Sequence, residues 1–182
     1  LDDVGFAQLG CFGSGISTPR IDEVAGGGLR YQRFHVTAVC SSTRAALLTG
    51  RNHHAVGMGV TEEAALGFPG YTGRIPRSAA TMARLLKDTG YNTMAVGKWH
   101  LGHHKKALLP MARGFTSFYG HYNGAFDYFT HEREGEHDWH RNAQTSRDEG
   151  YSTDLIGSEA VEVTPAHKDE HPRVPNAPSS SS

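Results

Sequence analysis

The order of apolar and polar residues along the first fifty positions predicts a helix, a strand and a second helix. "TPRIDEVA" has a helix-capping residue at Thr18 and Pro19 at the first helical position, and three glycines from Gly26 end it. Residues 29–39 alternate and are rich in β-branched and aromatic side chains, which predicts a strand. Residues 42–50 place apolar side chains at helical spacing and finish in a capping glycine.

The order helix, strand, helix is predicted again further along the chain. Residues 78–90 are typical of a capped helix and residues 91–97 of a buried strand, and another helix is predicted from Ser152. Residues 114–150 show no clear period, so we expect a long surface excursion there. Strands that alternate with short helices indicate an α/β fold with a mainly parallel sheet.

Two groups of reactive residues follow the predicted strands, where parallel sheets bind their ligands. Cys40 opens the second helix, with Arg44 and Arg51 after it. A thiol there is either a small buried apolar group or part of a pocket for a sulfate or phosphate ester. Lys98 and His100, two apart on an extended chain, would point the same way. They either bind an anion and protonate a leaving group, or simply end a strand.

The other candidate ligands for metals are carboxylates and histidines. The adjacent pair Asp2 and Asp3 suits a hard divalent cation through oxygen ligands, although a solvated turn is the alternative. The remaining histidines lack a recognised zinc spacing, so we expect solvated loop residues. Seven of them form three groups: His53 with His54, His103 with His104, and His131 with His137 and His140.

Composition narrows the class of protein. The 182 residues favour one domain, and a net charge of -1 argues against a nucleic-acid-binding protein. No apolar run is long enough to span a bilayer. The two cysteines, Cys11 and Cys40, are too few for a disulfide framework. Residues 164–182 are rich in proline and serine, which predicts a polar, disordered tail.

Four motifs follow one another along the chain: "DDVGFAQLGCFG", "STPRIDEVAGGGLRYQRFHV", "CSSTRAALLTGR" and "VGKWHLG". Together they resemble the sulfatase family, arylsulfatases in particular. The later segments "ARGFTSFYGHYNGAFDYFTHE" and "GYSTDLIGSEAV" are also similar to that family. The resemblance covers residues 1–163, which we interpret as the N-terminal part of a sulfatase catalytic domain. It implies an alkaline-phosphatase-like α/β sandwich, incomplete in this chain.

The resemblance also implies a reaction. In sulfatases the cysteine that matches Cys40 is oxidised to formylglycine by a formylglycine-generating enzyme. One hydroxyl of the hydrated aldehyde attacks the sulfur of a small sulfate ester, and the other then expels sulfate. A divalent cation, usually Ca²⁺, would be bound by Asp2, Asp3 and the modified Cys40.

The resemblance assigns the basic residues as well. Arg44 would hold the modified residue and the substrate, and Arg51 would support the turn after the helix. Lys98 would bind the sulfate group, and His100 would orient the hydrated aldehyde. In this interpretation the catalytic residues are Cys40 and three of these four: Arg44, Lys98 and His100.

The sequence departs from the family pattern at three places. Ser42 stands where the family's modification signal has proline, and Ser179 stands where an "NAPH"-like stretch has histidine. The segments that supply an Asp–Asn pair to the metal and a second lysine to the sulfate are absent. We therefore expect this chain to be a truncated form, marginally stable and weakly active or inactive.

Two alternatives stay open at this point. The first is a phosphonate or phosphate monoester hydrolase of the same superfamily, because tetrahedral anions make similar demands on Arg and Lys. The second is a non-catalytic, degenerate relative, which the departures at Ser42 and Ser179 favour. The compartment is unknown: a periplasmic or secretory route and the cytoplasm are both compatible with the sequence.

Overall fold

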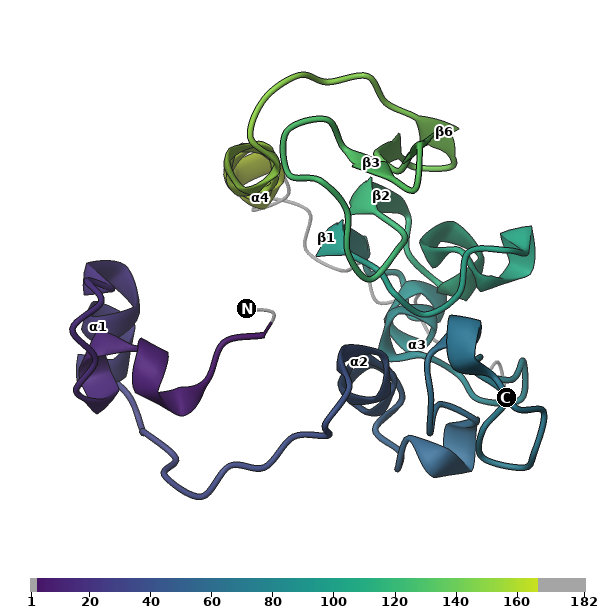
Figure 1. The fold of residues 1–182 in the computed structure, drawn as a ribbon, viewed down its shortest axis with the longest axis horizontal. Helices are drawn as coiled ribbons and strands as arrows, with labels where there is room; N and C mark the ends of the chain where they lie inside the picture. The colour runs from purple at the N-terminus through teal and green to yellow at the C-terminus, as the bar shows by residue number, and fades with distance from the viewer. Residues whose placement is uncertain (1–2, 167–182) are drawn as a thin grey trace, which may run out of the picture. The chain divides into compact units, whose positions relative to one another are not determined.

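The computed structural model describes residues 3–166 and divides the chain into two compact units (Figure 1). The first unit comprises residues 1–40 and the second residues 41–182. Among the described residues, no helix has the length and apolar character needed to cross a bilayer.

The first unit holds three short helices, which are η1 (Phe6–Gln8), η2 (Gly10–Phe12) and α1 (Pro19–Gly26). The predicted helix from Pro19 is confirmed. Thr18 precedes it, but its hydroxyl donates to the Asp22 carboxylate at 2.9 Å and accepts from the Gly10 N–H at 2.8 Å. Asp22 also accepts from the Cys11 N–H at 2.7 Å. These bonds join η2 to α1.

The predicted strand at residues 29–39 is wrong. The segment has no regular structure, and side chains that would face a sheet are exposed, Leu29 at 87% and Phe34 at 74%. Alternating apolar residues show that a segment can pair, but a strand forms only where a neighbouring backbone supplies hydrogen bonds. No strand is described in residues 3–40 to supply them.

The second unit contains most of the helices. They are α2 (Cys40–Thr49), η3 (His54–Val56), η4 (Glu62–Ala64), α3 (Met82–Asp88), η5 (Lys106–Leu108), η6 (Pro110–Arg113) and α4 (Ser152–Ala166). The predictions of α2 and α4 are confirmed. Helix α3 starts later than predicted, because the hydroxyl of Thr81 rather than that of Ser78 caps it, accepting from the Arg84 N–H at 3.2 Å. Helix α4 includes residues 164–166, which we predicted to belong to the disordered tail. The other residues of that predicted tail, from residue 167, lie outside the described residues.

The main sheet of the second unit is mixed, in the order β1-β2-β5-β6. Its strands are β1 (Met94–Lys98), β2 (Ser117–His121), β5 (His140–Arg141) and β6 (Gln144–Thr145), and a separate hairpin joins β3 (Glu132–Arg133) to β4 (Glu136–His137). Strands β1 and β2 are parallel, and the two outer pairs are antiparallel. The α/β class is therefore confirmed, with one parallel pair in the sheet. Strand β2 lies in the segment that we expected to be a surface excursion.

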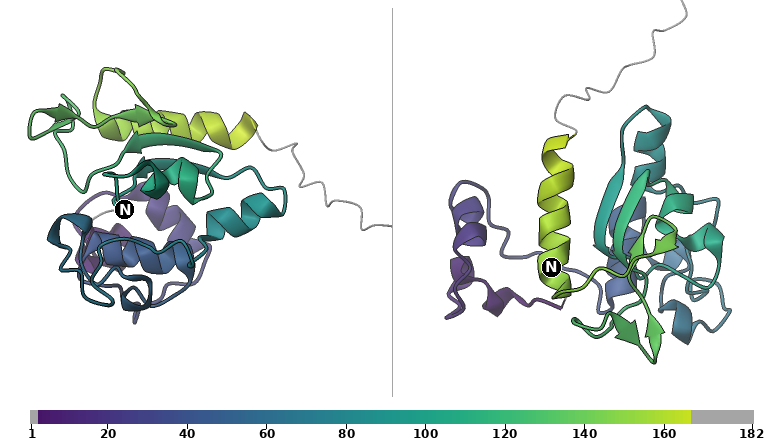
Figure 2. Two further views of the ribbon diagram at one scale, coloured as in Figure 1. Left: turned by 90° about the vertical axis from the view of Figure 1, so that its right-hand side faces the viewer. Right: turned by 90° about the horizontal axis from the view of Figure 1, so that it is seen from above.

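Helices cover both faces of the parallel pair (Figure 2). Helix α4 packs on one face, where Ile156 lies beside Gly97 of β1. Helix α2 and the segments after it pack on the other face and share a core with the sheet (Figure 1). That core consists of Ala45, Val56, Met58, Ile75, Ala79, Ala83, Trp99, Leu101, Phe115, Phe118 and Tyr122. Packing on both faces thus holds the parallel pair β1–β2 in place.

Candidate active site

The carboxyl ends of β1 and β2 bring together residues that are far apart in the sequence. Lys98, the last residue of β1, is in register with His121, the last residue of β2. Pairing continues beyond the strands: the N–H of Trp99 donates to the His121 carbonyl at 2.9 Å, and that of His100 to the Tyr122 carbonyl at 3.0 Å. Lys98 and His100 therefore lie at the sheet edge where we expected them.

Helix α2 is tied to the same edge through Arg44. The Arg44 Nη1 donates to the backbone carbonyl of Lys98 at 2.5 Å. Cys40 is one helical turn before Arg44, and residues four apart lie on one face of a helix. Cys40 is half-buried. The helix thus places Arg44 at the end of β1. It begins with the thiol, as the sequence predicted, although no strand precedes it among residues 3–39.

His100 is buried, with only 9% of the residue exposed. Its φ of +52° turns the backbone, so the alternation of an extended chain does not extend to this position. Burial lowers the pKa of His100, and the positive charges of Lys98, Arg44 and Arg133 lower it further. Glu63 opposes them, with its Oε1 3.8 Å from the His100 Nε2. The imidazole is therefore mainly neutral at pH 7.

The three cations that act on His100 come from three elements: Arg44 from α2, Lys98 from β1 and Arg133 from β3. Their combined field favours a bound anion at this edge of the sheet. Guanidinium and ammonium groups are the side chains that proteins use for tetrahedral oxyanions. The site can therefore hold a sulfate or phosphate ester, with a neutral imidazole beside it.

Gly124 packs against the ring of His100. A Cβ added at Gly124 would lie 2.5 Å from the His100 Cε1 and 2.6 Å from its Nε2, closer than real Cβ contacts allow. The backbone around it is fixed by Asp138, whose carboxylate accepts from the N–H groups of Tyr122 and Asn123 at 2.9 and 2.8 Å. Sequence analysis identified neither Gly124 nor Asp138.

His121, the last residue of β2, is only 5% exposed. Its Nδ1 is 2.9 Å from the Asn123 carbonyl, and its ring packs on Phe126 with centroids 4.1 Å apart. Burial lowers the pKa of His121 to about 4; the nearby charges of Lys98 and Arg44 add to this, and Asp138 opposes it. His121 is therefore a neutral structural residue at pH 7.

This burial predicts a loss of stability in mild acid. Unfolded histidine titrates near pH 6.5, so between pH 6.5 and about 4 only the unfolded chain gains the proton on this side chain. We expect the free energy of unfolding to fall by about 3 kcal/mol from this group over that range. Chemical denaturation at several pH values measures it. The variant His121→Phe should flatten the curve; an unchanged pH dependence in that variant would contradict the assignment.

The start of α2 is anchored by a buried serine. Ser42 is 2% exposed, and its hydroxyl donates to the backbone carbonyl of Met58. Ser41 beside it is fully buried. Ser42 is the position at which the sulfatase modification signal has proline. This chain therefore has a buried hydrogen bond at a position where proline would restrict the backbone.

No side-chain contact within residues 3–166 supports the roles predicted for the other site residues, Asp2, Asp3 and Arg51. Asp2 lies outside the described residues, and Asp3 is exposed, with a φ of +52°. Arg51 is exposed just after α2, and its backbone N–H donates to the Thr49 hydroxyl at 3.3 Å. Within residues 3–166, no hydrogen bond or ion pair of the Arg51 guanidinium is found. The metal role of Asp3 and the supporting role of Arg51 stay predictions.

The expectation of solvated loop histidines is wrong for residues 131–140. His131 is 1% exposed and stacks on Trp139 with ring centroids 4.6 Å apart. His140 lies 3.0 Å from the Asp138 carboxylate and stacks on Tyr122. These histidines belong to an aromatic cluster that holds β5 against β2. The spacing of these histidines in the sequence is not periodic, so it did not predict that they pack against aromatic rings.

Comparison with known proteins identifies the family. The sulfatase family model matches residues 1–174. The chain belongs to the sulfatase family. Mouse arylsulfatase J is 36% identical over 130 residues, which cover 71% of this chain and 21% of that protein. Human arylsulfatase A is 43% identical over 124 residues, covering 65% of this chain and 23% of that protein.

Solved structures of longer chains have a similar fold. The crystal structure of Ps i-CgsB matches with a TM-score of 0.80 and 30% identity, covering 94% of this chain and 41% of that chain. The complex of the same protein with k-i-k-neocarrahexaose matches with a TM-score of 0.79. The α/β fold described above is thus part of the sulfatase fold. The chain spans only about a fifth to a quarter of the length of the two arylsulfatases.

Proposed function

We propose that the protein is a sulfuric ester hydrolase of the arylsulfatase type. The observation that carries the proposal is the cationic group around His100, in which Arg44 and Lys98 meet at the end of a parallel strand pair in a sulfatase-family chain. A sulfate monoester carries negative charge on oxygens that such cations bind. Cys40 begins the helix that carries Arg44, and it would provide the nucleophile after conversion to formylglycine.

Each residue of this group has a proposed task. Lys98 and Arg44 bind the sulfate oxygens and stabilise the negative charge that increases on them during transfer. His100 is neutral before the substrate binds, so it can orient a hydroxyl of the modified Cys40 by a hydrogen bond. A bound anion offsets the surrounding positive charge and raises the pKa of His100, which readies it to give a proton to the leaving group.

The residues at the start of the chain fit a hard divalent cation. Asp3 presents an exposed carboxylate and Asp2 precedes it, so both donors are the oxygen ligands that Ca²⁺ prefers. We propose that they hold Ca²⁺ together with the modified Cys40. When bound, the ion would supply Lewis-acid polarisation of a sulfate oxygen.

Turnover by the complete protein tests the function. We would express it with a formylglycine-generating enzyme and compare an aryl sulfate with the matching aryl phosphonate. We expect sulfate hydrolysis that depends on Ca²⁺ and disappears in Cys40→Ala. Faster phosphonate hydrolysis would assign the protein to phosphonate chemistry instead. A fully modified protein that turns over neither ester would be a non-catalytic relative.

The non-catalytic alternative is favoured by Ser42. The hydroxyl of this residue packs the helix, and proline, which biases a segment toward the extended form that the modifying enzyme reads, is missing. Incomplete conversion of Cys40 would leave a folded protein with an anion site and no nucleophile. Such a protein would bind sulfate esters without hydrolysing them.

Replacing Ser42 by proline should therefore raise the fraction of Cys40 that is converted. Proline is tolerated in the first turn of a helix, so α2 should still form. The matched control is Ser42→Ala, which removes the hydrogen bond to Met58 without restoring proline. The control should keep the original conversion and lose about 1–2 kcal/mol of stability. Peptide mass spectrometry measures the conversion, and equal conversion in both variants would contradict this role of position 42.

A further inference from the structure

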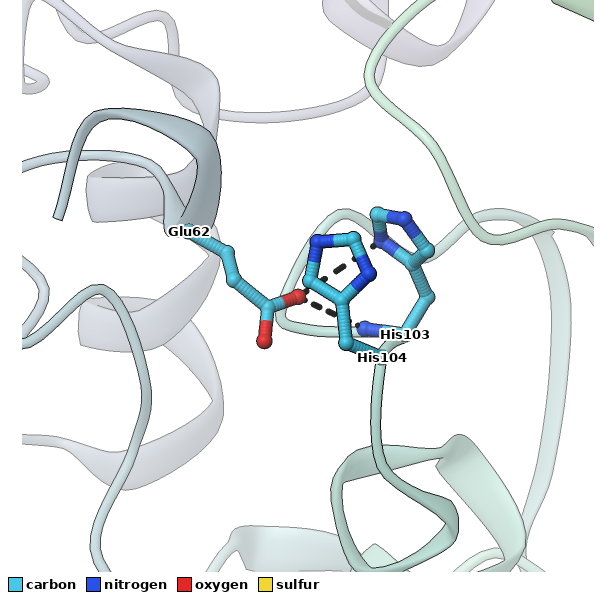
Figure 3. A group of neighbouring side chains, drawn as sticks. All are labelled: Glu62, His103 and His104. Carbon is cyan, nitrogen blue, oxygen red and sulfur yellow. Dashed lines mark hydrogen bonds and ion pairs between the residues drawn. The ribbon is translucent and has the colours of Figure 1, made fainter.

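A carboxylate and two imidazoles meet outside the active site, in the loop after β1. Glu62 comes from η4, and the tandem pair His103–His104 follows the strand (Figure 3). One ligand atom from each residue lies within 4.8 Å of the other two. None of these three side chains has a task in the proposed sulfatase reaction.

The Glu62 carboxylate is held in place before any metal binds. Its Oε2 accepts from the His103 backbone N–H at 2.8 Å, and the His103 Nδ1 is 3.6 Å from the same oxygen. The side chain of Glu62 is 13% exposed and that of His103 22%. The His104 ring lies beside the His103 ring, with centroids 4.1 Å apart, and remains exposed. The cluster therefore combines two partly buried ligands with an exposed third.

We propose that Glu62, His103 and His104 form a binding site for Zn²⁺. One carboxylate oxygen and two imidazole nitrogens match the ligands of zinc sites with an open position. Small side-chain rotations would bring the three donors to the distances of about 2 Å that zinc requires. Imidazole nitrogens suit Zn²⁺ better than Ca²⁺, so the site differs in metal preference from the proposed calcium site. Zinc binding here is independent of the proposed sulfatase activity.

The chain contains a matched control for this proposal. His53 and His54 are also adjacent, with ring centroids 4.2 Å apart and an interplanar angle of 44°, against 4.1 Å and 46° for His103 and His104. His54, however, lies 3.1 Å from the Tyr71 hydroxyl, and its pair is not part of a carboxylate-containing cluster among the described residues. The two pairs differ mainly in the presence of Glu62.

Isothermal titration with Zn²⁺ tests the proposal, in excess Ca²⁺ to occupy sites for hard cations. We expect one high-affinity Zn²⁺ per chain, weakened at least tenfold in His104→Asn and lost in the double variant H103N/H104N. The double variant H53N/H54N should bind as the unmodified protein does. Circular dichroism of each variant confirms folding, and His104→Asn changes an exposed side chain.

Coordination is checked by a second measurement. Co²⁺ in place of Zn²⁺ should give visible ligand-field absorption that Glu62→Gln weakens, because one charged ligand is lost. Equal Zn²⁺ binding by the unmodified protein and H103N/H104N would overturn the proposal. A greater loss in H53N/H54N, or the absence of any high-affinity Zn²⁺ binding, would overturn it as well.

Discussion

Lys98→Met should lower the turnover of aryl sulfates by the complete protein about 100- to 1000-fold. Lys98 is the last residue of β1, and its backbone carbonyl accepts a hydrogen bond from Arg44. Removing one preorganised charge from the developing oxyanion has an effect of this size in enzymes that transfer acyl groups. Methionine keeps the length and much of the apolar stem, so the packing of β1 should survive. Steady-state kinetics with an aryl sulfate measures the loss.

Lys105→Met is the matched control for this variant. Lys105 is exposed in the loop that follows the same strand. We expect its turnover to equal that of the unmodified protein. Conversion of Cys40 must be measured in both variants, so that loss of nucleophile is separated from loss of charge. Full conversion with unchanged turnover in Lys98→Met would show that Lys98 does not bind the sulfate group.

Gly124→Ala should lower turnover about 100-fold, although no charge or hydrogen-bonding group is removed. The new Cβ would meet the His100 ring at 2.5 Å, so the ring must move. The backbone N–H of His100 is bonded to the Tyr122 carbonyl, which limits how far the surrounding chain can adjust. A displacement of a catalytic group by about 1 Å is enough for a loss of this size. Turnover and thermal melting are measured together.

Gly15→Ala provides the comparison for Gly124. A Cβ added at Gly15 would meet no atom within 4 Å, so the same chemical change should leave turnover unaltered. If Gly124→Ala kept full turnover at full Cys40 conversion, His100 would not need its present position. In that case the role proposed for His100 would be wrong.

The helices that the sequence predicted correctly have characteristic residues, such as proline or glycine, at their own ends. Helix α1 begins with Pro19 at its first position, and α2 ends at Thr49, before Gly50, whose φ of +65° suits glycine. The strand at residues 29–39 was predicted from alternation alone and is not formed. Strand β2 was missed, because its stability comes from pairing with β1 and not from a pattern within its own residues. Pairing depends on residues distant in sequence.

In the candidate site, too, some residues could be predicted from the sequence and others could not. Arg44, Lys98 and His100 stand in motifs that resemble the sulfatase family, so their positions could be predicted. Arg133 and Glu63 influence the pKa of His100 from other elements, and no local pattern identifies either one. The tertiary structure was needed to bring them to the same sheet edge.

The proposed reaction depends above all on conversion of Cys40 to formylglycine next to this cationic site. Mass spectrometry of the peptide that contains residue 40, from protein made with a formylglycine-generating enzyme, tests it most directly. We predict a peptide about 18 Da lighter than the one with an intact thiol, since the thiol is replaced by an aldehyde. Cys40 recovered entirely as the free thiol, with the modifying enzyme shown to be active on another sulfatase, would contradict the proposed reaction.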